Sequence, residues 1–474
     1  MKNSLVSPVL FFVLTCIAIK SFSQAKTYLA QVELNKKHGC IDLQGKEIIP
    51  VKYDDMGFWG NGLIPVNTGA KEVNYLKKGG KWGYCNAKGV LVIPMQFEAA
   101  ETFCEGKAPV RIKNKWGFID TTGKMIIAPQ YDQTSQFRNE LCVVAKNRKW
   151  GIIDATGKEV IKLEYGELND FENGVARAFV GTKSDDGWEV KGGYCLINRK
   201  GEQITAPKYK SIFPFSDGLA RVEVPSTENK YDTKSGFINE MGELVIPAIY
   251  DEAEDFTDGM AAVGFRKKQE GIAFLESEYT WGYVNKQGVE VVKPQYSQAS
   301  KFMNDRAIVG KGNQRGFIVV IEAVNDSIIN HESHPKAALI DKDGRYLLNF
   351  DWQWLNPISD SLFIAHRAKY KGAGVINSKG ETIIPFKYAN LHYAGDSLFT
   401  ANDGRGKGGE SMVVDIHNNV LFRTKKYFIP ELGYEFGLLH IRNYSTNKEG
   451  LIDARGNMVI KDKYDMIVAF EATE

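Results

Sequence analysis

The chain has 474 residues, of which 43% are hydrophobic and 25% are charged, and its formal net charge at pH 7 is +2. A chain of this length is too long for one small core, so it must contain several domains or a repeat array. The near-neutral charge argues against a nucleic-acid surface, which needs a basic face, and gives no polybasic membrane signal.

Residues 1–23 have the features of a secretory signal peptide. Lys2 supplies the positive start, residues 9–19 form a short apolar run, and Ser21 and Ser23 are the small residues expected before a cleavage site. We therefore expect cleavage near Ser23–Gln24 and a secreted chain, in the periplasm, on the cell surface or outside the cell. A membrane anchor is the alternative, but this run is short for a span of about 20 residues. No later stretch of the sequence predicts a transmembrane segment.

Five cysteines follow in the first half of the chain, without any CxxC spacing: Cys40, Cys85, Cys104, Cys142 and Cys195. Most lie among apolar strand residues, which favours small buried side chains. An oxidising compartment leaves room for one disulfide.

A repeat unit is clearest in residues 115–132, KWGFIDTTGKMIIAPQYD. Asp120 and Gly123 predict a type I turn whose glycine has a positive φ, so the flanking segments become the arms of a β-hairpin. The same turn recurs at Asp42–Gly45, Asn86–Gly89, Asp120–Gly123, Asp154–Gly157, Asn198–Gly201, Asn239–Gly242, Asn285–Gly288, Asp341–Gly344, Asn377–Gly380 and Asp453–Gly456. Asp415–Asn418 is an eleventh copy, closed by asparagine, which also tolerates this conformation.

The arms keep a common pattern around each turn. An apolar residue precedes the Asx, and a glycine usually lies three residues before it, which predicts a bulge or a close backbone approach. The arm after the turn is β-branched and often followed by proline, which predicts an open edge or the end of pairing. An aromatic lies eight residues after the turn glycine, at Tyr53, Phe97, Tyr131, Tyr165, Tyr209, Tyr250, Tyr296, Trp352, Tyr388 and Tyr464.

A third strand follows a second turn, as in Leu63–Val66, Leu141–Val144, Val175–Ala178, Leu219–Val222, Met260–Val263 and Leu438–Ile441. About eleven such units fill residues 24–470, leaving a tail at 471–474. Extra residues at 181–191, 224–234, 265–279 and 318–336 all precede the Trp-Gly strand, so we expect them to project from one rim. A subdomain break near 318–336 is a further expectation.

The chain resembles the WG-repeat (KWG) family of bacterial repeat proteins. The residues that carry the resemblance are Trp82-Gly83, Trp116-Gly117, Trp150-Gly151 and Trp281-Gly282, each followed by the Asx turn and, further on, proline and an aromatic. Ser235-Gly236, Ala373-Gly374 and Glu449-Gly450 lack the tryptophan. Because this family is defined by its repeats, the resemblance implies an architecture and extracytoplasmic or surface roles rather than a reaction.

The predicted fold is all-β: tandem three-strand hairpin or meander units that form an open solenoid-like array. The alternative is one large β-propeller or two smaller ones, since propeller blades usually have four strands and number four to eight. In either case a single unit cannot bury its apolar strand without its neighbours.

The sequence predicts no catalytic site, metal site or cofactor. His331-Glu332-Ser333-His334 lacks the spacing that places two histidines on one helical face. Asp341 and Asp343 resemble the start of a calcium loop, but they fall on the repeat's turn pattern. Carboxylates are frequent because the turn requires them.

Aromatic side chains are the remaining candidates for binding. Their regular positions favour packing between units, so contacts with a ligand should come from tryptophans outside the repeat pattern: Trp59, Trp188 and Trp354. The function that follows is a secreted, non-catalytic binding or scaffold module of the cell envelope for an unidentified protein partner. A carbohydrate- or cell-wall-binding module for a surface glycan is the alternative, and an enzyme is a third hypothesis.

Overall fold

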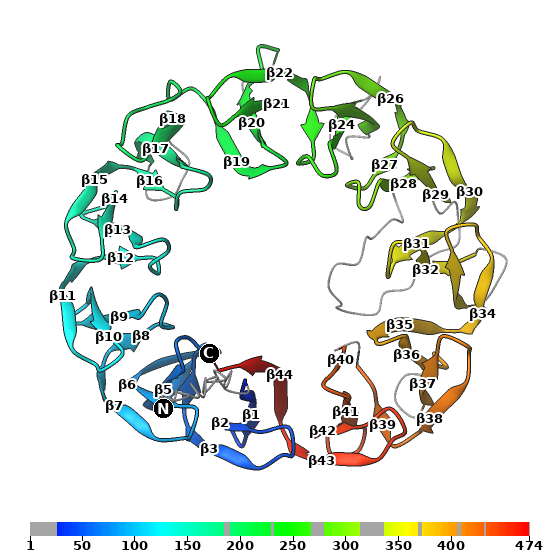
Figure 1. The fold of residues 1–474 in the computed structure, drawn as a ribbon, viewed down its shortest axis with the longest axis horizontal. Helices are drawn as coiled ribbons and strands as arrows, with labels where there is room; N and C mark the ends of the chain where they lie inside the picture. The colour runs from blue at the N-terminus through cyan, green and yellow to red at the C-terminus, as the bar shows by residue number, and fades with distance from the viewer. Residues whose placement is uncertain are drawn as a thin grey trace, which may run out of the picture.

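The computed structural model describes residues 26–183, 190–228, 232–266, 279–312, 336–367, 372–404, 409–430 and 433–473. The predicted signal peptide lies outside these residues. The described chain forms eleven antiparallel sheets that stand as blades around a central channel, in a closed β-propeller (Figure 1). The expected open solenoid is therefore wrong, and the alternative of one large propeller is confirmed.

From the channel outwards, the first six blades are built as follows (Figure 1). Blade 1 contains β44 (Met466–Ala472), β1 (Tyr28–Leu34), β2 (Lys37–Ile41) and β3 (Glu47–Tyr53); blade 2 contains β4 (Asp55–Met56), β5 (Leu63–Val73), β6 (Leu76–Asn86) and β7 (Leu91–Phe97). Blade 3 contains β8 (Ala99–Ala100), β9 (Lys107–Ile112), β10 (Lys115–Asp120) and β11 (Met125–Tyr131); blade 4 contains β12 (Gln133–Thr134), β13 (Leu141–Lys146), β14 (Lys149–Asp154) and β15 (Glu159–Tyr165). Blade 5 contains β16 (Glu167–Leu168), β17 (Val175–Lys183) and β18 (Val190–Asn198); blade 6 contains β19 (Ser211–Ser216), β20 (Leu219–Pro225), β21 (Thr233–Asn239) and β22 (Leu244–Tyr250).

The remaining five blades follow the same order. Blade 7 contains β23 (Glu252–Ala253), β24 (Met260–Arg266), β25 (Tyr279–Asn285) and β26 (Glu290–Tyr296); blade 8 contains β27 (Gln298–Ala299), β28 (Arg306–Lys311), β29 (Lys336–Asp341) and β30 (Tyr346–Trp352). Blade 9 contains β31 (Trp354–Pro357), β32 (Leu362–His366), β33 (Ala373–Asn377) and β34 (Thr382–Tyr388); blade 10 contains β35 (Asn390–Gly395), β36 (Leu398–Asn402), β37 (Ser411–Asp415) and β38 (Val420–Thr424). Blade 11 contains β39 (Tyr427–Phe428), β40 (Tyr434–Glu435), β41 (Leu438–Asn443), β42 (Glu449–Ile452) and β43 (Met458–Tyr464).

Most blades have four strands, which corrects the predicted three-strand unit. The strand that the predicted unit lacks is the innermost one, and in blades 2, 3, 4, 5, 7 and 8 this strand has only two residues. So short a segment has no alternation of apolar and polar residues that could reveal it. Blade 5 lacks a fourth strand instead: residues 203–209 approach β18 through the isolated bridges Ile197↔Gln203 and Tyr194↔Tyr209 and through a 2.8 Å hydrogen bond from the Ile204 amide to the Leu196 carbonyl.

All eleven predicted turns are present. In each, the amide of the fourth residue donates to the carbonyl of the Asx at 2.9–3.0 Å, as from Gly123 to Asp120. The closing glycines have φ between 75° and 87°, and Asn418 has φ 62°. These are left-handed conformations that glycine and asparagine tolerate best, so the turn chemistry fixes the register of the outer hairpin of every blade.

In eight blades a glycine lies three residues before the turn Asx, opposite a bulge in the neighbouring outer strand. In blade 3, Trp116 pairs with Tyr131 and Phe118 with Ile127, so two extra residues of β11 bulge opposite Gly117. A Cβ on Gly117 would stand 2.5 Å from the Ile127 carbonyl oxygen. Pro129 lies in this bulge on the outermost strand, whose free edge needs no amide donor.

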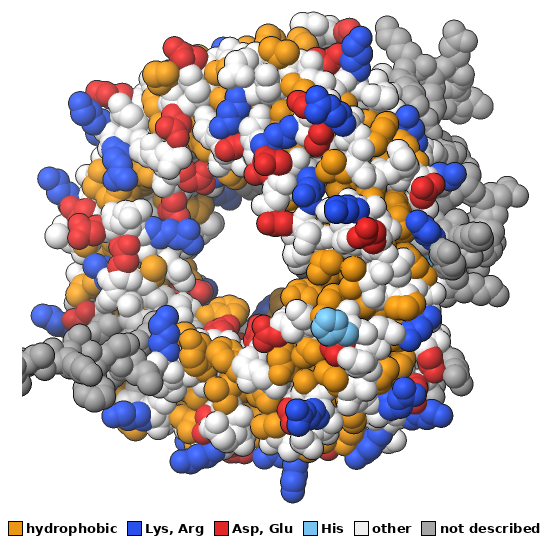
Figure 2. All heavy atoms as spheres, turned by 45° about the vertical axis from the view of Figure 1, so that its right-hand side comes forward, with side chains coloured by type: hydrophobic (Ala, Val, Ile, Leu, Met, Phe, Trp, Pro, Cys, Tyr) orange, Lys and Arg blue, Asp and Glu red, His pale blue; other side chains and the backbone are white. Residues whose placement is uncertain are grey.

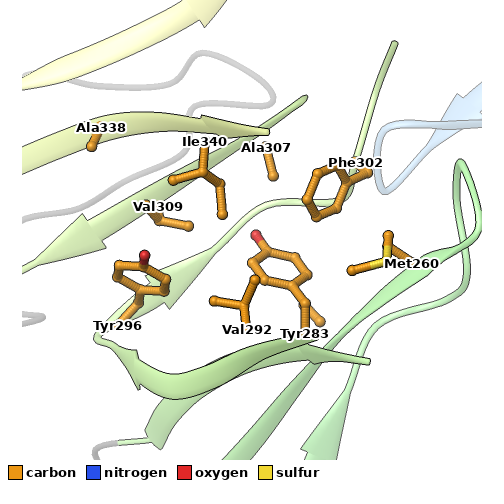
Figure 3. Packing of buried hydrophobic residues seen from close by; sticks show 10 residues of the cluster. Met260, Tyr283, Val292, Tyr296, Phe302, Ala307, Val309, Ala338 and Ile340 are labelled. Carbon is orange, nitrogen blue, oxygen red and sulfur yellow. The ribbon is translucent and has the colours of Figure 1, made fainter. Parts of the chain in front are cut away.

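The hydrophobic cores lie between blades. Figure 3 shows the contact of blades 7 and 8, where Tyr283, Val292 and Tyr296 from one blade meet Phe302 and Ile340 from the next. The Tyr283 hydroxyl donates a 2.8 Å hydrogen bond to the Ser300 carbonyl across the same boundary. Each blade therefore completes its core only with its neighbours, which explains why one unit cannot fold alone.

The last strand of the chain closes the ring. β44 pairs with β1 from Tyr28↔Ala472 to Glu33↔Met466, so the expected C-terminal tail begins within a strand. The Glu449 carboxylate of blade 11 accepts a 2.7 Å hydrogen bond from the Ile467 amide of blade 1. A shared core of blade 11 and blade 1 side chains fills the seam: Ala30, Val32, Ile41, Leu438, Leu451, Ile460, Tyr464, Ile467 and Phe470.

The ring has two faces with different loops. The turn face carries the Asx turns and the loops between first and second strands, whereas the hairpin face carries the connections between second and third strands. The longer connections at 184–189, 229–231, 267–278 and 313–335 lie outside the described residues, but the strands they join end on the hairpin face. Residues 313–335 connect β28 with β29, two paired strands of blade 8.

Candidate functional site

The Trp-Gly pairs belong to the framework of the blades. Each tryptophan is half-buried and lies opposite the aromatic of the outer strand: Trp82 opposite Phe97, Trp116 opposite Tyr131, Trp150 opposite Tyr165 and Trp281 opposite Tyr296. The glycines Gly83, Gly151 and Gly282 meet the outer strand as Gly117 does, with a Cβ placed 2.4–2.6 Å from a carbonyl oxygen. Both residues therefore serve packing between strands.

The lysine before Trp-Gly also has a structural partner. Lys115 forms an ion pair with Asp132, which also accepts a 2.7 Å hydrogen bond from the Asn147 amide. Lys37 pairs with Asp54 at 2.5 Å and Lys234 with Asp251 at 2.7 Å in the same positions of other blades. The aspartate thus ties the end of the outer strand to the next blade's hairpin.

Trp59, a predicted contact residue, lies in the hydrophobic core. Its side chain is 9% exposed and packs with Tyr53, Ile64 and Val66. Once the innermost strands are aligned, Trp59 occupies the position that phenylalanine fills in the following blades: Phe103, Phe137, Phe171, Phe215, Phe256 and Phe302. It is a repeat residue after all, and its ring is not a free platform for stacking.

Trp354 is 37% exposed at the start of the innermost strand of blade 9. It stacks on His366, with ring centroids 5.8 Å apart and planes at 21°. The His366 Nδ1 lies 2.7 Å from the Gln353 Oε1, which fixes the imidazole behind the indole. This is a supported aromatic surface at the hairpin face. Trp188 lies outside the described residues, and Trp59 and Trp354 are in blades 2 and 9, so the structure does not bring them together.

Exposed apolar side chains gather at the mouth of the channel on the turn face. The most exposed are Phe58 (65%), Met303 (63%), Phe436 (48%) and Tyr393 (39%), which come from the loops and inner strands of blades 2, 8, 11 and 10; we call these four residues the apolar arc. Figure 2 shows hydrophobic side chains along the lower rim of the opening, where Figure 1 places blades 10, 11, 1 and 2.

The rest of the mouth is polar. The loop position of Met303 is occupied by Arg138 in blade 4, Ser216 in blade 6 and Thr257 in blade 7. Within the arc, the Phe436 ring lies 4.5 Å from that of Tyr28 and so bridges the seam between blades 11 and 1. The arc therefore marks one side of an otherwise repetitive ring, and sequence reasoning missed it because its members occupy different positions of the repeat.

The described residues do not offer an evident nucleophile. A cavity of about 10 Å³ between blades 4 and 5, large enough for one water, is lined by Cys142, Asp170 and Arg199. Burial raises the pKa of the Cys142 thiol to about 11, so this group is protonated at neutral pH and reacts poorly. Burial also raises the pKa of Asp170, opposed by Arg138. The other described cysteines are free, and all except Cys104 are buried.

Metal chemistry finds no support in the described ranges, where no three His, Cys, Asp or Glu side chains converge. The Asp341 carboxylate accepts hydrogen bonds from the amides of Asp343 and Arg345 at 3.0 and 2.8 Å, so it caps its turn as the other Asx residues do. The segment from His331 to His334 lies outside the described residues. Within the part of the chain that is described, no helix is long and apolar enough to span a bilayer.

The family model "WG containing repeat" matches residues 39–71, 82–116, 116–150, 150–183, 194–224, 236–268, 281–314 and 374–393, more than half of the chain. The chain belongs to the WG-repeat family. The resemblance drawn from the Trp-Gly pairs is thereby confirmed. The matched segments cover parts of blades 1–10, while blade 11 lies beyond the last match.

Solved structures similar to this WG-repeat protein are distant. They include a eukaryotic initiation factor (11% identity, TM-score 0.37, covering 77% of this chain and 97% of that one). The β-propeller domain of the Trilobed protease from Pyrococcus furiosus has 10% identity and a TM-score of 0.28, with coverage of 64% and 97%. Dipeptidyl peptidase 4 of Porphyromonas gingivalis has 11% identity and a TM-score of 0.32, with coverage of 83% and 64%. No curated protein matches. Likenesses at this level say nothing about what the chain does.

Proposed function

We propose that this WG-repeat protein is a non-catalytic binding module of the cell envelope that holds a protein partner at the turn-face mouth of its channel. The observation that supports this is the apolar arc, with Phe58, Met303 and Phe436 each about half exposed or more. Large exposed apolar side chains on one surface, with polar residues beside them, are typical of protein interaction sites. Aromatic and methionine side chains are also enriched at such interfaces.

The arrangement favours a partner that enters the mouth from one side. The apolar residues lie on blades 8, 10, 11 and 2, while the loops of blades 4, 6 and 7 are polar at the matching position. A partner with an apolar segment would bury Phe58 and Met303 and leave the polar loops of blades 4, 6 and 7 exposed to water. Such anchors dominate binding energy in protein interfaces.

A matched pair of methionines tests this proposal. Met303 and Met241 are exposed to similar extents, 63% and 69%, but Met241 lies in an outer Asx turn, away from the mouth. A photo-crosslinker at position 303 should capture one reproducible envelope protein, and a crosslinker at 241 should not. The purified partner should bind the wild type, and the double variant Met303→Ser/Phe58→Ser should weaken binding at least tenfold, which corresponds to about 1.4 kcal/mol. Equal loss of binding in Met241→Ser would contradict a site at the mouth.

Carbohydrate binding is the second candidate, supported by the Trp354 surface. An exposed indole backed by His366 could stack on a sugar ring, with Gln353 beside it. A glycan array and a peptidoglycan pull-down on residues 24–474 test this function. Binding that Trp354→Ala abolishes and Met303→Ser leaves intact would favour the glycan over the protein partner. The control Tyr346→Ala removes an aromatic of similar exposure from an outer strand.

Export is part of the proposal. The lysine at position 2 and the apolar run before Ser21 support delivery by a signal peptide. The mature protein purified from the producing cell should begin at Gln24, as N-terminal sequencing would show. An intact N-terminus on protein recovered from the cytoplasm would overturn this part.

A further inference from the structure

The hairpin of β5 and β6 extends beyond the other described hairpins on the hairpin face. Its strands have eleven residues each, whereas the second and third strands of blades 3 and 4 have six. At about 3.4 Å per residue the tip reaches roughly 15 Å further out than its neighbours. The tip is the Asn74-Tyr75 turn, with φ of 51° and 62°.

The base of this hairpin is anchored by a buried asparagine. Asn67 is 0% exposed; its Oδ1 accepts a hydrogen bond from the Ala70 amide at 3.1 Å, and its Nδ2 donates to the Gly79 carbonyl at 3.2 Å. The ladder lacks one pair here, Gly69 with Gly80, but the register continues unchanged from Thr68↔Lys81 to Ala70↔Gly79. Asn67 therefore holds this interruption in one arrangement, and the tip is presented as part of the fold.

The tip is apolar and the stem behind it is basic. Tyr75 is 96% exposed, Leu76 61% and Val73 45%. Val73 pairs with Leu76, and Lys71 pairs with Lys78, so a lysine pair and an apolar pair follow each other on one face of the hairpin. Two like charges directly opposite each other destabilise a sheet. An anionic surface against this face would relieve that cost.

Neighbouring hairpins on the same face are basic at their tips as well. In blades 1, 3 and 4 these tips carry Lys36, Lys113, Lys146, Arg148 and Lys149, in addition to Lys37 and Lys115, which are paired with Asp54 and Asp132. Lys36 is 74% exposed in its side chain and pairs with Glu72 at 2.9 Å, which joins the hairpins of blades 1 and 2. Glu98 is occupied in capping the Lys113 and Asn114 amides at 3.1 and 3.0 Å. The hairpin face over blades 1–4 therefore offers several cations around one apolar point.

We infer that the β5–β6 tip inserts into an anionic phospholipid bilayer, with the hairpin face of blades 1–4 turned towards the headgroups. A tyrosine with aliphatic neighbours suits the boundary between headgroups and acyl chains. The surrounding lysines are attracted electrostatically to anionic lipid headgroups, which strengthens binding. A protein partner fits less well, because lysine is depleted in protein interfaces and this tip projects as a convex hairpin. The inference is independent of the proposed partner site, which lies on the opposite face.

Vesicle binding by the purified chain, residues 24–474, tests this inference. The protein should sediment with vesicles of phosphatidylglycerol mixed with phosphatidylcholine and stay in solution with phosphatidylcholine alone. Binding should weaken as salt rises, because the lysine contribution is electrostatic. Tyr75→Ser/Leu76→Ser should reduce the affinity for anionic vesicles at least about tenfold. Lys71→Gln/Lys78→Gln should reduce it to a similar extent, since each lysine near such a surface raises the affinity several-fold.

A matched control lies on the same blade at the opposite face. Val90 and Leu91 are 54% and 42% exposed beside the Asn86–Gly89 turn, so Val90→Ser/Leu91→Ser removes similar apolar surface away from the membrane side. This control should bind vesicles as the wild type does. An environment-sensitive fluorophore on Asn74→Cys should shift to the blue with anionic vesicles, which reports insertion even if a serine variant folds poorly.

Three results would overturn the inference: no sedimentation with anionic vesicles, sedimentation unchanged in both tip and lysine variants, or no spectral shift at position 74. If an immobilised acidic protein bound the tip while vesicles did not, the hairpin would be a docking site for an acidic protein instead.

Discussion

Gly117 lies where the bulge of β11 approaches the third strand of its blade, with no space for a Cβ. Gly374 occupies the same position in blade 9, where a Cβ would stand 2.6 Å from the Ile384 carbonyl oxygen, although Ala373 replaces the tryptophan. Glycine therefore fits this close contact with or without its Trp neighbour, while blade 8 keeps the same bulge with Ala338 in this position. The half-buried tryptophan adds packing against the aromatic of the outer strand. In other blades a smaller side chain, such as Ala373, takes its place and packs less.

Gly117→Ala and Gly374→Ala should each lower the unfolding free energy by about 1–3 kcal/mol, because the added methyl must displace backbone. Trp116→Phe should cost less, about 1 kcal/mol, since most of the contact with Tyr131 survives. Urea denaturation monitored by circular dichroism would measure all three. A neutral Gly374→Ala would mean that the outer strand can shift and that the glycine is not required.

The Lys115–Asp132 ion pair makes stability depend on pH. The hydrogen bond from Lys115 holds the pKa of the Asp132 carboxyl below its usual value. The unfolded carboxyl titrates near pH 3.9, so this stabilisation is fully present above about pH 4 and is lost as the pH falls towards the folded-state pKa. Lowering the pH below 4 should therefore reduce the unfolding free energy of the wild type more steeply than that of Asp132→Asn. Acid titration monitored by circular dichroism would measure both. Lys115→Gln should reduce the acid sensitivity in the same way, and an unchanged profile in both variants would rule out this pair as a cause.

Much at this scale could be predicted from the sequence. Each Asx turn, the glycine with its close contact and the buried outer aromatic are local features, and all were found where expected. Trp59 was assigned outside the repeat because the innermost strand before it was not recognised, so its match with Phe103 was hidden. The exposed Trp354 was picked out by sequence, but its stacking on His366 depends on pairing between β31 and β32.

The elements of a blade follow from local rules except for the innermost strand. The third predicted strands at Leu63, Leu141 and Leu219 begin where β5, β13 and β20 begin. The innermost β12 consists of Gln133 and Thr134 alone and forms only because β13 offers a free edge beside the channel. Its existence is a tertiary effect, which is why the unit was taken to have three strands.

Ring closure depends on the seam between blades 11 and 1. Glu449 is 4% exposed and accepts hydrogen bonds from Arg442 at 2.5 and 3.2 Å, as well as from Ile467. Glu449→Gln weakens each of these bonds inside the seam, so we expect a loss of about 2–4 kcal/mol and a lower melting temperature. Glu435→Gln, on an exposed residue of the same blade, should have little effect. Equal stability of the two variants would show that the carboxylate does not hold the seam.

The described chain forms a closed ring in which its first and last described residues lie side by side. The Thr473 amide donates to the Thr27 carbonyl at 3.0 Å, across nearly the whole length of the chain. Local pattern carries no information on such a contact, so the sequence favoured an open array, and the closed ring becomes evident only from the pairing of β44 with β1. For the same reason a net charge of +2 did not indicate the lysines of the hairpin tips, because only folding brings these tips onto one face.

A circular permutant tests closure directly. Joining Thr473 to Thr27 through a short Gly-Ser linker and opening the chain between Asn147 and Arg148, at an exposed hairpin tip, should give a folded monomer. Its melting temperature should stay within a few degrees of the wild type, since only one exposed turn is cut. Small-angle scattering would compare the two shapes. A permutant that is unfolded while Asn147→Gly is stable would argue against adjacent ends.

The number of blades has a consequence for symmetry. Eleven is a prime number, so no group of two to ten blades repeats at regular intervals around the axis. A two-fold, three-fold or six-fold assembly placed on that axis therefore cannot meet equivalent blades at each of its subunits. The orientation of anything that binds coaxially has to come from the blades that depart from the repeat. Substitutions in the repeated residues would then decide whether the ring exists, and substitutions at Phe58, Met303 or Phe436 would decide which way a bound molecule points.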